Sequence, residues 1–543
     1  MNVAGLFNAF SLSLRRHWPW VMTAALVPLA WLLHPAYGMA WDDAQHAVYG
    51  DLVLRYFSSG FTDMRWRDEM GMLKFYGTLF DLPSAAIHRA LHADLHRHRP
   101  FLMAVSGILA VPAVAGIGRL VGGERCAAFS IAALLMMPQF VGQSFINCKD
   151  IPLATAFAWS GLLAMRLYRT VTWQVVLAAG VAVGGAMAVR LNGGVLALAF
   201  IVALLGFGVM QRRPWRMPSK ALVGRVQGVV GATTVIAAVA FLCLVAVWPY
   251  AHRNAFTSLV EAFRVADAFP VSFTVLFDGR EYDSDRLPWH YLPTMLVLTA
   301  PLTIVVPFFA GAGVAASALV RHWRRPTAGP LFLLLLWVAF PIAYVIIRRP
   351  NIYDGVRHFL FVLPAAAVLA GIGLQQAVAV AARSRRWLGF AAVAAWVVAT
   401  APLLTMWHPY QYVFHNVLAG DRQTLHERFD TEYWMTSYRE AAQHVNVIQN
   451  RSHHSLRLIV GANDLSVVCF QAFADPRIRI RYGLGRFREP SLPDDCDYMV
   501  TITRYGMWRN FPESRVAYEI RRCGVLMCTI KAGGTEAGAR REP

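Results

Sequence analysis

Residues 41–51, WDDAQHAVYGD, place three carboxylates and a histidine directly after the apolar run 18–40. A carboxylate in such a position can form a salt bridge, bind a cation or accept a proton. Asp42 and Asp43 are neighbours and cannot lie on the same face of a helix, so we expect them to do different jobs. A simpler alternative stays open, because an aspartate beside a helix start can also cap free amide groups.

Further charged residues lie at the edges of other apolar stretches. Asp150 stands in INCKDIPLA, where it too could cap a helix. Basic residues stand in comparable positions: Lys74 in GMLKFYG, Arg190 in AVRLNGG, and Arg357 beside His358 in YDGVRHFLF. Each cation could instead extend toward lipid headgroups. If the chain brings these groups together, the carboxylates would serve as a base or as metal ligands, and the cations would bind a phosphate.

A divalent cation is a candidate cofactor, with Asp42, Asp150 and His46 as its candidate ligands. We favour a packed or capping role for His46. The chain has no paired CxxC motifs, so the sequence indicates no structural zinc site. Four cysteines in the tail could form disulfides or remain separate buried thiols, and the sequence leaves both open: Cys469, Cys496, Cys523 and Cys528.

The chain that must position these groups has 543 residues, of which 57% are hydrophobic and only 15% charged. Soluble proteins carry about a quarter charged residues. The 291–320 stretch is long enough to tilt strongly or to break. We expect a polytopic α-helical membrane protein with about eleven transmembrane helices, at 18–36, 100–120, 126–144, 152–168, 173–190, 193–210, 226–248, 291–320, 329–347, 358–380 and 387–406.

The net charge of +19 is concentrated on one side of this topology. The loops 1–17, 119–125, 166–172, 211–225, 321–328 and 381–386 hold 17 Lys and Arg residues and one acidic residue. Such a bias predicts a cytoplasmic N-terminus and places the other loops and the tail outside. The charge is thus a topology signal, and we expect no nucleic-acid partner.

Two outer regions differ from simple loops. Residues 37–99 are too long for a connection and too polar to span, which predicts short helices at the outer interface. After a transmembrane module over 1–406, residues 407–543 alternate short apolar runs with polar stretches. This pattern predicts a small extracytoplasmic α/β domain whose extreme C-terminus, 532–543, is disordered.

Five motifs, taken in order, resemble those of the GT-C glycosyltransferases, polytopic enzymes that include protein O-mannosyltransferases and the aminoarabinose transferases of lipid A. The pair Asp42–Asp43 resembles their Asp-Glu signature, LKFYG their Lys-containing segment, and KDIPLA their second-loop Asp motif. AVRLNGG resembles their Lys/Arg-Gly element, and GVRHFLFVLPAAAVL the start of a late helix. Position 43 departs from the common Glu. The tail resembles that of a bacterial subgroup and lacks the protein-mannosyltransferase insert.

This resemblance implies an inverting glycosyltransferase of the bacterial inner membrane. It would move a sugar from a polyprenyl-phosphate donor to an extracytoplasmic hydroxyl of an envelope lipid, lipopolysaccharide, glycan or protein, in contact with membrane lipids. Asp42 would be the general base, while Asp43 and Asp150 would position the acceptor, orient Asp42 or hold a divalent cation. The donor phosphate would bind Lys74, Arg190, Arg357 and His358.

A lipid or solute transporter is the main alternative, because charges within a membrane often line a substrate path. The candidate residues, however, lie in outer loops rather than near the midplane. No pair of broken helices in matching halves indicates an inverted repeat. A non-catalytic subunit that binds glycans through its tail is a third alternative, and we favour the glycosyltransferase.

Overall fold

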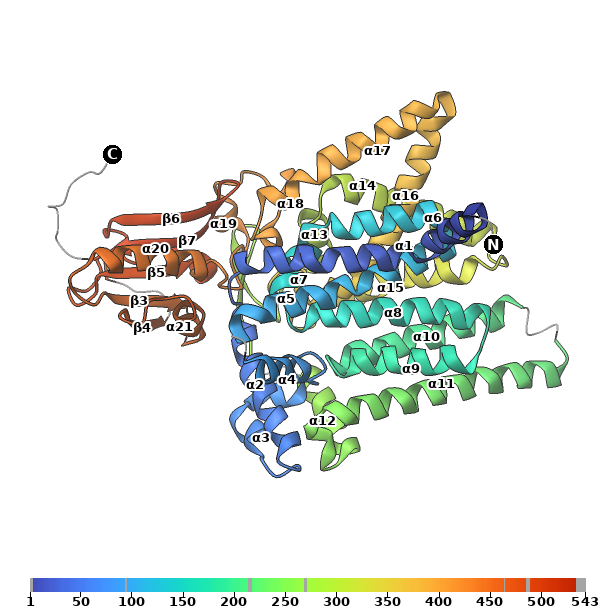
Figure 1. Cartoon of the computed structure of the whole chain (residues 1–543), viewed down its shortest axis with the longest axis horizontal. Coiled ribbons are helices and arrows are strands. Elements are labelled where there is room, and N and C mark those ends of the chain that lie inside the picture. Colours follow the sequence, from blue (N-terminus) through green and yellow to red (C-terminus); the bar gives the residue numbers. More distant parts are fainter. Residues whose placement is uncertain are drawn as a thin grey trace.

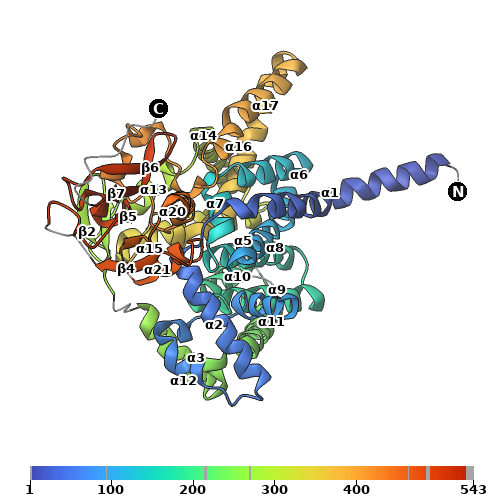
Figure 2. The ribbon, with the colours of Figure 1, turned by 60° about the vertical axis from the view of Figure 1, so that its left-hand side comes forward.

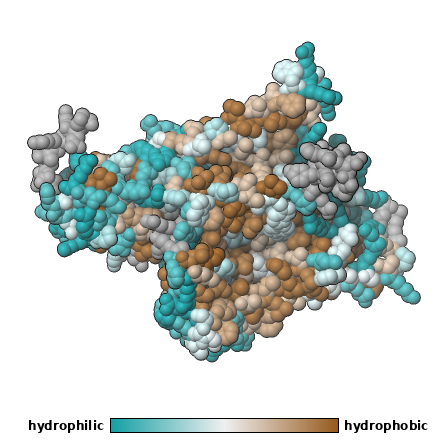
Figure 3. All heavy atoms as spheres, viewed as in Figure 1, coloured by the Kyte–Doolittle hydropathy of each residue, from teal (hydrophilic) through white to brown (hydrophobic). Residues whose placement is uncertain are grey.

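The structure is a computed structural model that describes residues 3–92, 95–212, 217–267, 271–462, 464–484 and 489–533. Most of these residues form helices that run side by side, and a small sheet lies beyond one end of this bundle (Figure 1). Apolar side chains cover the middle of the bundle, whereas polar side chains gather at its ends and over the sheet (Figure 3). Only part of the C-terminus predicted to be disordered is described, and from residue 534 on it lies outside the described residues.

The bundle consists of helices because every backbone polar group in a lipid environment needs a partner within its own segment. Eight stretches of the described chain are long and apolar enough to cross a membrane. The helices of the bundle are α1 (Val3–Leu33), α5 (Leu95–Ile108), α6 (Ala110–Leu135), α7 (Pro138–Ile146), α8 (Asp150–Arg169), α9 (Trp173–Met187), α10 (Leu191–Gln211), α11 (Ser219–Val247), α13 (Tyr291–Leu298), α14 (Leu302–Arg321), α15 (Ala328–Arg348), η5 (Arg357–Val362), α16 (Leu363–Ser384), α17 (Arg386–Thr400) and α18 (Pro402–Met406).

One of the eight stretches, 98–135, folds back on itself and contains two antiparallel helical parts. Gly123 at the reversal has φ 77° and ψ −167°, a conformation that glycine adopts without a steric penalty. A Cβ atom added to Gly118 would lie 2.7 Å from Cα of Ala127. Residues nine apart in a straight helix are about 13 Å apart, so the chain must reverse here.

Helices cover all eleven predicted membrane segments within the described part of the chain. The folded-back stretch supplies two of them, and α8 and α9 supply two that length and composition alone do not select. The long segment predicted at 291–320 is broken between α13 and α14. The predicted class, a polytopic α-helical membrane fold, is confirmed.

A layer of short elements lies at the end of the bundle that faces the sheet (Figures 1 and 2). Region 37–99 forms short helices here, as predicted. On α12, the side chains of Phe256, Val260 and Phe263 are exposed on one helix face, which is the pattern of a helix at a membrane interface. The elements of the layer are η1 (His34–Ala36), α2 (Trp41–Ser58), α3 (Arg65–Glu69), η2 (Gly71–Phe75), α4 (Asp81–Leu91), η4 (Pro249–His252), α12 (Ala255–Asp267) and the hairpin of β1 (Thr274–Phe277) and β2 (Arg280–Asp283).

The tail forms a five-stranded mixed sheet of order β4-β3-β5-β7-β6, in which β3 pairs in parallel with β4 and β5, and β7 pairs antiparallel with β5 and β6. All seven cysteines of the chain are free thiols. The elements of the tail are η6 (Gln411–Val413), η7 (Val417–Ala419), α19 (Leu425–Arg428), α20 (Tyr438–Arg451), β3 (Arg457–Ala462), α21 (Asp464–Gln471), β4 (Arg479–Leu484), β5 (Tyr498–Ile502), η8 (Arg504–Arg509), β6 (Val516–Arg522) and β7 (Val525–Ala532).

The stretch between the last bundle helix and the sheet packs against the end of the bundle. Trp407 and Trp434 are fully buried. Gln139 Nε2 on α7 donates a hydrogen bond of 2.6 Å to the carbonyl oxygen of Tyr412. The tail is therefore joined to the bundle by a buried contact rather than by a free linker.

Within the bundle, α14 and α16 cross closely at two glycines. A Cβ atom on Gly311 would overlap the carbonyl oxygen of Leu369, and a Cβ atom on Gly373 would overlap that of Pro307. Small residues at such a crossing let two helix backbones approach each other.

We expect Gly311→Ala to lower the thermal unfolding midpoint of the protein in detergent, because the new methyl group must push α14 away from α16. Overpacking of this kind destabilises by about 1–3 kcal/mol. Gly313→Ala is the matched control, since Gly313 lies on the same helix and its Cβ would meet open space. Circular dichroism during heating measures both, and equal midpoints would contradict the tight crossing.

Candidate functional site

Asp42 lies in the first turn of α2, immediately after the first membrane helix. Its side chain is only 9% exposed, and Oδ2 lies 2.7 Å from Nζ of Lys149 and 3.4 Å from a terminal nitrogen of Arg357. The N-cap residue of α2 is Ala40, and no side chain caps it. The partners of the Asp42 carboxylate are therefore cations, and the capping alternative does not describe it.

The two cations keep Asp42 ionised. Burial raises the pKa of Asp42, but the charges of Lys149 and Arg357 lower that pKa by more, so it lies below its ordinary value. Burial likewise lowers the pKa of Lys149, and the charge of Asp42 more than offsets this effect. At neutral pH the site thus holds a carboxylate and an ammonium group in direct contact.

Arg357, at the start of η5, is held from several sides. The rings of Tyr353 and Trp434 lie 4.6 Å and 4.7 Å from its guanidinium carbon, a favourable arrangement for a cation. A terminal nitrogen lies 3.1 Å from Oδ2 of Asp354. Its Nε donates a hydrogen bond of 3.3 Å to Nε2 of His358, so His358 acts here as an acceptor.

Asp150 begins α8 and is oriented by a chain of amide side chains. Asn147 accepts the backbone N–H of Asp150 at 2.8 Å and donates to its Oδ2 at 2.9 Å. Gln143 in turn accepts hydrogen bonds of 3.1 Å from Asn147 and from the indole of Trp434. The other oxygen of Asp150 lies 3.1 Å from Arg190, so this chain fixes the direction of the Arg190 guanidinium.

These ion pairs form two sets that meet at the ring of Tyr76, which lies 5.2 Å from Nζ of Lys149 and 5.8 Å from the guanidinium carbon of Arg190. We call the two sets together the charge cluster. It has four cations and three carboxylates and therefore carries one excess positive charge, a composition that suits a phosphate ligand. The Arg190 side chain is 21% exposed, more than any other member. The members are Asp42, Lys149, Asp150, Arg190, Asp354, Arg357 and Arg504.

Three long helices begin at the charge cluster. Asp42 lies in the first turn of α2, Lys149 is the N-cap residue of α8, and Arg190 is the N-cap residue of α10. The first amide groups of a helix point along its axis and carry a partial positive charge. The ends of these helices thus add to the preference of the cluster for an anion.

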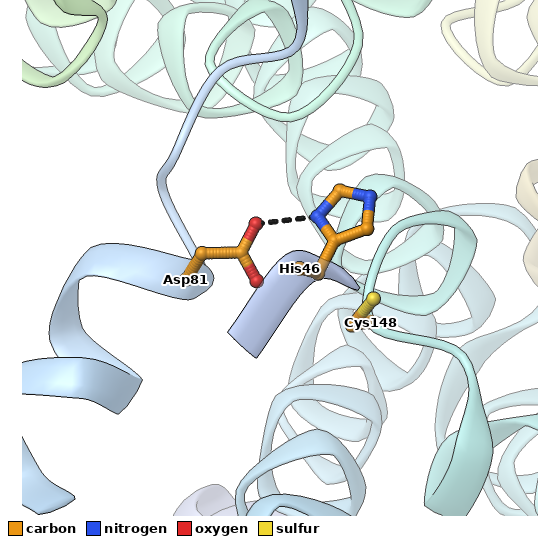
Figure 4. Close-up of side chains that lie close together, drawn as sticks. All are labelled: His46, Asp81 and Cys148. Carbon is orange, nitrogen blue, oxygen red and sulfur yellow. Dashed lines mark hydrogen bonds and ion pairs between the residues drawn. The ribbon is translucent and has the colours of Figure 1, made fainter. Parts of the chain in front are cut away.

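Asp43 belongs to a second buried network, so the two neighbouring aspartates have different partners, as expected. Arg99 lies 2.6 Å from Oδ1 of Asp43 and 2.9 Å from Oδ1 of Asp81. Nδ1 of His46 lies 2.6 Å from the other oxygen of Asp81, and the two side chains face each other in Figure 4. This network joins α2 to α4 and α5. His46 is packed within it, which is the role favoured from the sequence.

His46, Asp81 and Cys148 also offer atoms that could hold a metal ion, within 4.8 Å of one another (Figure 4). Both oxygens of Asp81 are already engaged, one by His46 and one by Arg99. A metal ion would have to displace these contacts beside a buried guanidinium, so the group fits an ion-pair network better than a metal site.

The metal ligands predicted from the sequence do not form a common site either. Asp42 is engaged by Lys149, Asp150 by Arg190, and His46 by the second network. As arranged, these residues do not fit a divalent cation.

Five of the seven predicted site residues lie together: Asp42, Asp150, Arg190, Arg357 and, in contact with the charge cluster, His358. Asp43 lies in the second network. Lys74 lies outside both: its ammonium is 5.5 Å from the ring centroid of Phe75, and it forms no ion pair within the described ranges. The contacts of Lys74 thus place it outside the charge cluster.

Sequence reasoning missed four members or neighbours of the cluster. Lys149 lies in KDIPLA, but the sequence comparison singles out only the aspartate of that motif. Asp354 stands three residues before Arg357. A carboxylate so near an arginine at a membrane boundary could have indicated an ion pair. Trp434 and Arg504 lie in the tail, where no spacing relates them to the other residues.

Residues 90–251 match the sequence profile of the dolichyl-phosphate-mannose-protein mannosyltransferase family. This segment contains Lys149, Asp150 and Arg190. No curated protein sequence matches the chain.

Among solved structures, the chain is similar to ArnT from Cupriavidus metallidurans bound to undecaprenyl phosphate, with 14% identity over 96% of this chain and 99% of that chain and a TM-score of 0.46. Apo ArnT from the same organism is 15% identical over 94% of this chain and 97% of that chain, with a TM-score of 0.48. A third similar structure is the archaeal oligosaccharyltransferase AglB from Archaeoglobus fulgidus, in complex with an inhibitory peptide and a dolichol-phosphate. It is 12% identical over 97% of this chain and 75% of that chain, with a TM-score of 0.49. The segment that matches the family profile is less than a third of the chain, so the likeness to this mannosyltransferase family holds for that segment.

Proposed function

We propose that the chain is a membrane glycosyltransferase of the GT-C type. It moves a sugar from a polyprenyl-phosphate donor to an acceptor hydroxyl, with inversion at the anomeric carbon. The observation that carries the proposal is the buried Asp42 carboxylate between Lys149 and Arg357. It places a base beside cations that suit a phosphate, at the end of a bundle whose middle is apolar (Figure 3). A lipid-linked sugar needs both environments at once.

In the proposed reaction, Asp42 accepts the proton of the acceptor hydroxyl while the hydroxyl oxygen attacks the anomeric carbon. The bond between that carbon and the phosphate oxygen breaks, and the polyprenyl phosphate leaves with the electron pair. Lys149, Arg190 and Arg357 stabilise the negative charge that grows on the leaving phosphate. Attack opposite the leaving group inverts the anomeric configuration.

In this proposal the donor phosphate and Asp42 share two cations, so donor binding also changes the basicity of Asp42. A carboxylate whose pKa is lowered by two cations is a weak base. A phosphate that binds Lys149 and Arg357 draws part of their charge away from Asp42 and raises its basicity. Donor binding would thus prepare the base for the acceptor.

The other predicted residues take supporting roles in this proposal. Asp150 orients Arg190, and Asp43 anchors α2 through Arg99, so both act at a distance from the reacting atoms. His358 accepts a hydrogen bond from Arg357 and helps to orient it. The acceptor is a hydroxyl of an envelope lipid, a glycan or a protein.

We further propose that the chain lies in the bacterial inner membrane with a cytoplasmic N-terminus and the sheet domain of the tail, 407–543, outside. The proposal is supported by the 17 Lys and Arg residues of the loops on one predicted side. The start of α1 and the sheet lie at opposite ends of the bundle in Figure 1, as an odd number of spans requires.

Asp42→Asn is expected to reduce sugar transfer about 10²- to 10⁴-fold, because the amide cannot accept the proton. The assay uses purified protein in nanodiscs, a panel of polyprenyl-phosphate sugars and an envelope lipid extract. Asp51→Asn is the matched control, since Asp51 lies on the same helix and pairs with the exposed Arg55. An Asp42→Asn variant as active as this control would rule out Asp42 as the base.

The pH profile should depend on Lys149. Because the cations hold the pKa of Asp42 below its ordinary value, kcat/KM of the wild type should show no acidic decline above about pH 4. In Lys149→Met, burial acts with one cation fewer, so the pKa of Asp42 should rise by about one to three units. The acidic decline in the activity of this variant should therefore begin at a higher pH than in the wild type. An unchanged shape of the profile would contradict the assigned pair.

A further inference from the structure

Arg357 is divided between two carboxylates. One terminal nitrogen lies 3.4 Å from Oδ2 of Asp42 and 3.1 Å from Oδ2 of Asp354. Both carboxylates are buried, and Asp354 is not exposed at all. Because both anions attract the guanidinium, any further partner of Asp354 affects how much of the Arg357 charge faces Asp42.

Arg504 of the tail is a second cation at Asp354. Its side chain is 2% exposed, and a terminal nitrogen lies 2.8 Å from Oδ1 of Asp354. The other terminal nitrogen donates a hydrogen bond of 3.3 Å to the carbonyl oxygen of Tyr433. Tyr433 adjoins Trp434, whose ring covers Arg357. One arginine of the tail therefore contacts both the carboxylate that competes for Arg357 and the segment that covers it.

The backbone holds Asp354 in this position. Asp354 has φ 58° and is followed by Gly355 with φ 65°, so both lie in the left-handed region, which Asp and Gly tolerate better than other residues. This tight turn directs Asp354 between the two arginines. With Arg504 present, the charges alternate from Lys149 through Asp42, Arg357 and Asp354 to Arg504.

We propose that the C-terminal domain completes the catalytic centre, with Arg504 as a positioning residue that neutralises Asp354 and so keeps Arg357 available to Asp42 and to the donor phosphate. This inference rests on the proposed function for the identity of the ligand. Without Arg504, Arg357 is the one ion-pair partner that the described residues leave to the buried Asp354, which draws Arg357 away from the phosphate. The domain would thus act on the reaction through one buried ion pair.

The test measures the affinity of the full-length protein in nanodiscs for undecaprenyl phosphate, together with KM and kcat for the donor. Arg504→Met should weaken phosphate binding about tenfold and raise KM more than it lowers kcat. Arg509→Met is the matched control, because Arg509 lies in the same element, η8, but is exposed. It contacts the ring of Trp508 and pairs at 3.9 Å with the exposed Glu427.

The decisive variant combines Arg504→Met with Asp354→Asn. Because the amide no longer competes for Arg357, the double variant should bind the phosphate more tightly than Arg504→Met alone, although it has lost one more native charge. A purely structural role of Arg504 predicts the reverse, with two losses that add. If Arg504→Met does not fold, Arg504→Lys, which keeps the charge, should bind the phosphate nearly as well as the wild type.

The outcomes separate this inference from the proposed function. Equal affinities of Arg504→Met and Arg509→Met, or a double variant weaker than Arg504→Met, would overturn the positioning role while sugar transfer by the wild type remains. Weak phosphate binding by Arg504→Lys would overturn it as well. A wild type that neither binds undecaprenyl phosphate nor transfers sugar would overturn the proposed function itself, and this inference with it.

Discussion

A buried charge must have a partner of opposite sign, and this requirement shapes the end of the bundle that faces the sheet. An ion removed from water loses several kcal/mol of solvation unless its partner and further hydrogen bonds compensate. The charge cluster meets this requirement by alternation, from Lys149 at one end to Arg504 at the other. Each ion pair joins segments that are distant in sequence, so α2, α8, η5 and η8 must meet for any one of these charges to be buried.

The second network meets the same requirement at the other face of α2. Arg99 lies between Asp43 and Asp81, and His46 completes the group. Two neighbouring aspartates thus fix the helix from both sides, one through the charge cluster and one through α4 and α5. This arrangement explains how a carboxylate can be held at a fixed position on a helix that itself lies outside the membrane spans.

The membrane fold follows from properties that a sequence displays openly. Long apolar stretches predict spans without knowledge of their neighbours, and helices cover all eleven predicted segments of the described chain. The reversal at Gly123 agrees with two separate predicted spans. The convergence of Asp42, Asp150, Arg190 and Arg357 was predictable only from a resemblance to known motifs, since their own spacing does not relate them.

Other features depend on tertiary contacts that no local pattern reveals. Lys74 has the residue type and the topological side expected of a phosphate ligand, yet it lies beside Phe75, outside the cluster. Lys149, one residue from a recognised aspartate, takes the position at Asp42 instead. Arg504 belongs to a sheet domain whose strands indicate nothing about the bundle, and only the folded chain brings it to Asp354.

The central claim, that the cluster binds the phosphate of the donor beside Asp42, is tested most directly by an experimental structure of the wild type with a bound polyprenyl phosphate. The account predicts a phosphate within hydrogen-bond distance of Lys149, Arg190 and Arg357, with the polyprenyl chain directed along the apolar bundle. A phosphate bound at Lys74 or at Arg99, away from Asp42, would contradict it.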